Sequence, residues 1–156
     1  MGIFNVKDIF KIAVKIEERG EKFYRETAKL LNSPKVVQLF NKLADDEAQH
    51  RVTFARMAEK LGETVQTENL QDEFYAYLKA YTQNLIFDDA SDDFSKIKDA
   101  RTALTFAIDK ELDSVLYYTE IKNLIPVSEH AFVDEIINEE RRHVVNLSIL
   151  RKALSD

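Results

Sequence analysis

Apolar side chains recur every three to four residues through four long segments, and this helical spacing is the feature that most restricts the fold. The stripes run from Ile9 to Leu31, Val37 to Leu61, Leu104 to Ile121 and Val133 to Leu150, and the first includes Leu30. Residues that break helices are scarce, since the 156 residues include only three Gly and two Pro. The pattern predicts an all-α chain whose four helices bury their apolar faces against one another.

Turn signals separate these stripes. We expect Ser33 to cap the second helix and Pro34 to occupy its first position. Gly62 is placed to end that helix, Pro126 closes the third stripe, and Ser128 is suited to cap the fourth helix. We therefore expect a single domain over residues 1–156, with hairpins at about 5–62 and 97–154 and a long, partly helical crossover at about 63–96.

Acidic and imidazole side chains interrupt each stripe near its middle. Glu17 lies between Ala13 and Tyr24 in the first stripe, so its carboxylate points to the same side as the core residues. Two Glu-x-x-His pairs fall in the second and fourth stripes, and a single Glu falls in the third. In chain order these residues are Glu17, Glu47, His50, Glu111, Glu140 and His143.

The two halves of the chain resemble each other around these residues. AVKIEERGEKFY from Ala13 aligns without gaps on AIDKELDSVLYY from Ala107, which places Glu17 over Glu111. DDEAQHRVTF likewise aligns on NEERRHVVNL, so the two Glu-x-x-His pairs also correspond. Such internal repetition predicts two helical hairpins that face each other.

Buried together, four carboxylates would lose hydration and repel one another, so their burial needs compensating charge. Residues three apart lie on one side of a helix, so each Glu-x-x-His pair presents an oxygen and a nitrogen to one cation. Two divalent ions would balance the four carboxylates, and this donor set suits iron or manganese, with zinc able to compete. Alternatively, an error of about 100° in the stripes would leave both Glu-x-x-His pairs exposed. Taken without the internal repeat, Glu17 and Glu111 would be expected to form ion pairs on the helix surface.

Composition excludes several other classes of function. The absence of Cys excludes disulfides, a thiolate nucleophile, a Cys zinc site and an iron-sulfur cluster. The net charge of -6 and the pI of about 5.2 oppose nucleic-acid binding. The first twenty residues lack the continuous apolar run of a signal peptide or membrane span, so we expect a cytoplasmic protein with no membrane partner.

The order of these six residues along the chain and the similarity of its two halves resemble the ferritin-like di-iron carboxylate proteins. Within them, the chain resembles the rubrerythrin-like branch without the rubredoxin-type domain. The resemblance covers about 8–61 and 98–154 and implies a ferritin-like antiparallel four-helix bundle. It implies that Glu47 and Glu140 bridge two iron ions and that Glu17 and Glu111 bind at the ends. His50 and His143 would each bind one ion.

The resemblance further implies a di-iron oxidoreductase that reduces hydrogen peroxide or dioxygen in defence against oxidative stress. Because the chain has no Cys, its electrons would come from a separate, rubredoxin-like donor protein. A homodimer or another homo-oligomer is expected. Ser114 departs from rubrerythrins proper, which carry an extra Glu there, so a redox-dependent movement of one iron between ligands is in doubt. The alternatives are an iron storage or buffering protein with a ferroxidase centre, and a non-catalytic metal-binding module.

Several further residues have two interpretations. Tyr24 and Tyr118, at equivalent positions, would hydrogen-bond a ligand carboxylate or relay an electron, or they are ordinary core aromatics. Gly20 is expected to leave room near the metals, and His130 to be exposed.

The crossover at about 63–96 contains two segments of unusual composition, one aromatic and one acidic. Its aromatic residues, from Phe74 to Phe87, would pack on the bundle or form a lid or a dimer surface. Its acidic run, Asp88 to Asp93, is expected to be a solvated loop or to collect ferrous ions.

Overall fold

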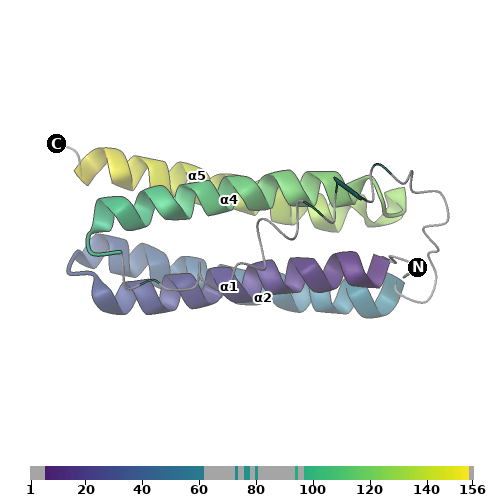
Figure 1. Cartoon of the computed structure of the whole chain (residues 1–156), viewed down its shortest axis with the longest axis horizontal. Helices are drawn as coiled ribbons and strands as arrows, with labels where there is room; N and C mark the ends of the chain where they lie inside the picture. Colours follow the sequence, from purple (N-terminus) through teal and green to yellow (C-terminus); the bar gives the residue numbers. More distant parts are fainter. Residues whose placement is uncertain are drawn as a thin grey trace.

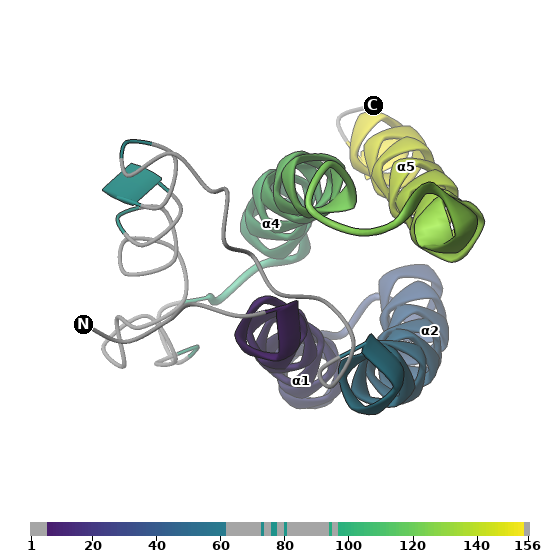
Figure 2. The ribbon, with the colours of Figure 1, turned by 90° about the vertical axis from the view of Figure 1, so that its right-hand side faces the viewer.

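The computed structural model describes residues 6–61 and 97–154, together with residues 73, 76, 77, 80 and 94. Its long helices are α1 (Val6–Leu30), α2 (Pro34–Leu61), α4 (Ala100–Lys122) and α5 (His130–Leu154), and a short 3-10 helix, η3 (Val127–Glu129), precedes α5. Along the bundle, α1 and α5 run in one direction and α2 and α4 in the other (Figure 1). The end-on view places the four helices at the corners of a square, so that neighbours are antiparallel (Figure 2). The expected all-α antiparallel four-helix bundle is confirmed.

The helix starts follow local sequence. The second helix begins at Pro34, and the N–H of Val37 donates to the carbonyl oxygen of Ser33 at 3.0 Å. Asp99 caps α4, because its side chain accepts a 2.8 Å hydrogen bond from the backbone N–H of Thr102. The expected cap at Ser128 is wrong: this residue lies within η3, and α5 begins only at His130.

The apolar core consists of two clusters, one toward each end of the bundle. One contains Ile9, Phe10, Ala13, Phe54, Met57, Ala58, Leu61, Tyr117, Tyr118, Ile121, Ile125, Val133, Ile136 and Ile137. The other contains Phe23, Tyr24, Ala28, Leu31, Val36, Phe40, Leu43, Ala44, Phe94, Ile97, Ala103, Leu104, Ala107, Ile108 and Leu147. On every long helix a buried Glu lies between the residues of the two clusters. A polar layer therefore crosses the middle of an otherwise apolar interior.

The structure corrects details of the stripes. Leu30 is 55 % exposed, because it stands at the last position of α1 on its outer side. His130 is half-buried rather than exposed, since its Nε2 donates to the carbonyl oxygen of Ile125 at 3.1 Å. It lies at the start of α5, where the chain turns back from Ile125, so helical periodicity alone could not place it.

Contacts also tie the two hairpins together. The hydroxyl of Tyr117 donates to the carbonyl oxygen of Ile9 at 3.1 Å, and Lys60 pairs with the buried Glu129 at 2.9 Å. These contacts join α4 to α1 and η3 to α2.

Most of the crossover lies outside the described residues. Of its aromatic residues, Phe74, Tyr75, Tyr81 and Phe87 fall there, as does the acidic run 88–93. Tyr77 is helical and 42 % exposed, and Phe94 packs edge-on against Phe23 with ring centroids 5.2 Å apart.

A matched pair of leucines on α4 tests the assigned core. Leu104 is fully buried and Leu112 is 50 % exposed. We expect Leu104→Ala to lower the free energy of unfolding by about 2–5 kcal/mol, because it leaves a cavity, and Leu112→Ala to lower it by less than about 1 kcal/mol. Urea unfolding followed by circular dichroism measures both, and equal losses would contradict the assigned orientation of α4.

Candidate metal centre

The polar layer brings together all six residues that the sequence singled out as metal ligands. They come from four helices and are at most 3 % exposed: Glu17 from α1, Glu47 and His50 from α2, Glu111 from α4, and Glu140 and His143 from α5. They form two groups of four, Glu17, Glu47, His50 and Glu140 in the first and Glu47, Glu111, Glu140 and His143 in the second. Within each group one ligand atom per residue lies within 4.8 Å of the others. Glu47 and Glu140 belong to both groups.

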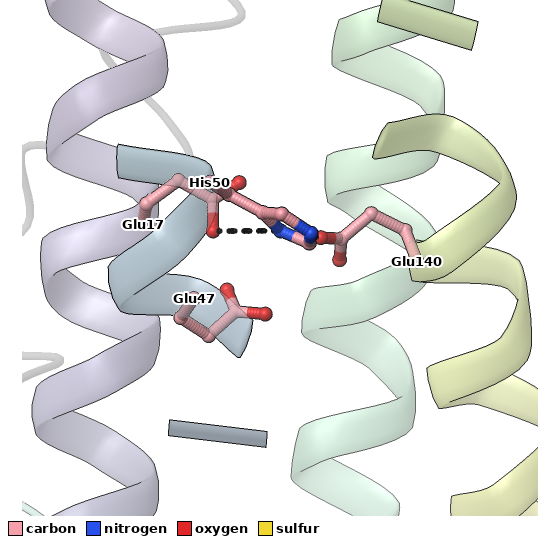
Figure 3. Close-up of side chains that lie close together, drawn as sticks. All are labelled: Glu17, Glu47, His50 and Glu140. Atoms are coloured by element: carbon pink, nitrogen blue, oxygen red, sulfur yellow. Dashed lines mark ion pairs between the residues drawn. The ribbon is translucent and has the colours of Figure 1, made fainter. Parts of the chain in front are cut away.

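Glu140 faces one group with each carboxylate oxygen. Its Oε1 lies 2.8 Å from Nδ1 of His50, and its Oε2 lies 3.8 Å from Nδ1 of His143. Figure 3 shows His50 between Glu140 and Glu17, whose Oε2 is 3.5 Å from the same Nδ1. This is the placement that a carboxylate shared by two cations requires.

The atoms that face the centre lack hydrogen-bond partners. Among the described residues, the buried atoms without one include Oε2 of Glu17, Oε1 of Glu47, both carboxylate oxygens of Glu140 and Nδ1 of both histidines. Buried polar atoms are normally hydrogen-bonded, so a cluster of unpartnered ones calls for an explanation. Oxygen and imidazole donors that converge without partners fit a bound metal ion.

The outer nitrogen of each histidine contacts a carboxylate of the neighbouring helix. Nε2 of His50 lies 2.6 Å from Oε2 of Glu139, and Nε2 of His143 lies 3.1 Å from Oδ2 of Asp46. These contacts hold a proton on Nε2, so that each Nδ1, once it loses its own proton, can offer its lone pair to a cation in the centre. Sequence analysis missed both carboxylates, although each directly precedes the Glu of a Glu-x-x-His pair.

Two tyrosines cross between the hairpins. Tyr24 of α1 donates a hydrogen bond to Oε1 of Glu111 on α4, and Tyr118 of α4 donates one to Oε1 of Glu17 on α1. Burial and the neighbouring carboxylates raise the pKa of both hydroxyls well above 10, so both remain protonated donors at neutral pH. Of the interpretations open at the sequence level, the hydrogen bond to a carboxylate is the one observed.

Burial sets the electrostatics of the layer. Burial, together with neighbouring carboxylates, raises the pKa of Glu47 and of Glu140 well above 4.5. For the histidines, burial opposes protonation, but the nearby carboxylates of Glu140 and Glu17 raise the pKa of His50 to about 11. The carboxylates of Glu111 and Glu140 raise the pKa of His143 to about 10. Without metal, protons therefore supply the positive charge that the carboxylates need.

Glu17 and Glu111, which each belong to only one of the two groups, are the outer glutamates of the layer. A small residue lies three positions beyond each of them. Gly20 is in α1, and a Cβ built there would lie 2.7 Å from Oε2 of Glu47. Ser114 is buried in α4 and donates its hydroxyl hydrogen to the carbonyl oxygen of Lys110 at 3.1 Å, so it bonds within its own helix. Neither position supplies a carboxylate to the layer.

The fold and this donor set define a ferritin-like helical bundle with a carboxylate and histidine centre. The rubrerythrin family model matches residues 8–150, and the chain belongs to that family. It is also similar to a crystal structure from Thermotoga maritima described, provisionally, as a ferritin-like diiron-carboxylate protein. That likeness has a TM-score of 0.70 and 26 % sequence identity, and it covers 97 % of each chain. No curated protein matches.

Among the described residues, no helix is both long and apolar enough to cross a lipid bilayer.

The raised histidine pKa values predict that metal binding releases protons. At pH 7 both imidazoles are protonated, and each must lose a proton from Nδ1 to bind a cation. We expect at least about one proton released per Mn²⁺ bound, so that the logarithm of the association constant rises by about one or more per pH unit between pH 6 and 8. Calorimetric titration in buffers of different ionisation enthalpy measures this release.

His130→Gln is the matched control, because His130 lies outside the layer and its loss leaves the release unchanged. Binding that is independent of pH over this range would contradict the assignment of the imidazoles as ligands.

Proposed function

We propose that the polar layer holds two iron ions and that the protein is a di-iron oxidoreductase that reduces hydrogen peroxide or dioxygen. The observation that carries the proposal is the sharing of Glu47 and Glu140 between two four-residue groups. One ion would leave half of this charged, buried set uncompensated, whereas two divalent ions balance its four carboxylates.

The proposed ligand roles follow the contacts. Glu47 and Glu140 serve as the shared carboxylates, Glu17 and His50 complete one site, and Glu111 and His143 complete the other. Such an arrangement, with single Glu residues on two helices and Glu-x-x-His on the other two, is that of ferritin-like di-iron proteins. Iron is favoured over manganese or zinc by the family, while the donor set itself accepts all three.

When bound, two ferrous ions would supply the two electrons that reduce hydrogen peroxide to two waters, with two protons taken up. The chain's own residues orient and insulate that chemistry. Asp46 and Glu139 fix the imidazole rings, and Tyr24 and Tyr118 hold the outer carboxylates. The apolar clusters on both sides restrict water. With no Cys in the chain, we propose that a separate, rubredoxin-like protein returns the electrons.

Alanine variants of the shared ligands test the metal assignment. We expect about two iron ions per chain in the parent and loss of most of them in Glu47→Ala and in Glu140→Ala, because each removes a carboxylate from both sites. Elemental analysis of purified, iron-loaded protein measures the content, and circular dichroism confirms folding. Glu59→Ala, an exposed change on the same helix as Glu47, is the control and keeps the metal. Unchanged content in both ligand variants would refute the assignment.

Single-turnover kinetics test the reaction. Protein loaded with ferrous iron without oxygen and mixed with hydrogen peroxide is expected to oxidise about two ferrous ions per peroxide, faster than the same iron in buffer. Stopped-flow absorbance measures the rate, and a parallel experiment with dioxygen identifies the preferred oxidant. Glu47→Ala is expected to lose the fast phase.

Slow oxidation by both oxidants would remove the enzymatic proposal. Light scattering separates the storage alternative, because storage requires a large cage, whereas we propose a homodimer or a similarly small homo-oligomer.

A further inference from the structure

Gly20 lies directly against one of the two shared carboxylates. A Cβ built on its backbone would be 2.7 Å from Oε2 of Glu47, 3.4 Å from its Cδ and 3.5 Å from its Cγ. The first separation is shorter than Cβ atoms make in real proteins, so a side chain at position 20 requires Glu47 to shift. The glycine φ angle is not positive, so the backbone conformation itself does not demand glycine. Space, not backbone geometry, is the reason for this residue.

The Glu47 carboxylate is the flexible end of its side chain, so it can shift, but any shift moves it relative to the centre. Glu47 is 3 % exposed, and its other oxygen, Oε1, lies 3.4 Å from Nδ1 of His143. A methyl group on α1 would push the carboxylate away from Gly20, which changes the separation between Oε1 and this nitrogen. Metal sites tolerate displacements of only about 0.5 Å in their ligands. A helix interior also disfavours glycine relative to alanine, so a residue in mid-α1 that lowers helix stability calls for a compensating role.

We propose that Gly20 is a positioning residue: its missing side chain seats the Glu47 carboxylate where both four-residue groups can share it. The expected effect on metal binding rests on the proposed metal centre, but the close approach of Gly20 to Glu47 does not depend on it. Any side chain at position 20 displaces Glu47 and weakens both ion sites together.

Ser114 provides the matched comparison. It occupies the equivalent position on α4, three residues beyond Glu111 as Gly20 is three beyond Glu17, and its hydroxyl bonds to Lys110 of the same helix. Gly20→Ala adds a methyl group against Glu47, whereas Ser114→Ala removes an oxygen and adds no atom. Both variants carry alanine at corresponding places.

The test compares Mn²⁺ titrations of the parent, Gly20→Ala and Ser114→Ala, followed by calorimetry. We expect Gly20→Ala to bind both ions about ten- to a hundredfold more weakly and Ser114→Ala to bind as the parent does. A purely structural role of Gly20 would change unfolding but not affinity. Parent-like affinity in Gly20→Ala would overturn the inference, while the parent's own binding would still support the proposed metal centre.

A double-mutant cycle with Glu47→Asp sharpens the test. Aspartate is one methylene shorter, so it withdraws the carboxylate from position 20. If the two residues interact sterically, Glu47→Asp costs less affinity in the Gly20→Ala background than in the parent. Strictly additive losses would count against the inference.

A crystal structure of metal-free Gly20→Ala separates this inference from the proposed function. We expect the Glu47 carboxylate to be displaced relative to the metal-free parent. This readout holds even if the parent binds no Mn²⁺, an outcome that would remove the proposed function alone. An unmoved carboxylate beside the new methyl group would overturn the inference.

Discussion

The burial of four carboxylates and two imidazoles in the middle of the bundle is the constraint on which the rest of the structure depends. Each carboxylate loses hydration there, and the pKa values of Glu47 and Glu140 rise because of that burial and the neighbouring charges. An apolar layer of the same shape would stabilise the fold better, since buried charges are costly even when paired. Burial of the two apolar clusters on either side stabilises the fold and offsets the cost of burying this layer.

Contacts between helices then fix the layer as a unit. The histidines of α2 and α5 each meet the carboxylate of the other helix, through Glu139 and Asp46, and the tyrosines of α1 and α4 exchange hydrogen bonds with the outer glutamates. Each of these pairs joins the two hairpins, so neither hairpin holds a complete site. The internal repeat of the sequence becomes a pseudo-twofold arrangement in which one half orients the ligands of the other. Assembly of the site and docking of the hairpins are therefore the same event.

The sequence allowed prediction of the bundle and the convergence of the six polar residues, because helical periodicity and the repeat place Glu17 and Glu111 at equivalent points. It did not reveal the roles of Asp46 and Glu139, since each lies on a helix side that periodicity marks as polar, and its contact with a histidine forms only when the neighbouring helix packs against it. The predictions that Leu30 lies on the buried stripe and that Ser128 caps the fourth helix were wrong for a related reason. Helix ends are decided by how the chain turns, which a stripe does not record. Ligation by the six residues stays a prediction.

The two small residues beyond the outer glutamates limit the number of carboxylates in the layer. A carboxylate at the position of Ser114, as in the rubrerythrins that this chain resembles, would offer one ion an alternative ligand when its charge changes. With Gly20 and Ser114 at both equivalent positions, the proposed centre would have only its four glutamates to accommodate such a change. Asp46 and Glu139, the carboxylates that directly precede the shared pair, contact the histidines. The outer glutamates are in turn held by tyrosines, which leaves the shared pair, Glu47 and Glu140, as the residues whose position would govern both proposed ions.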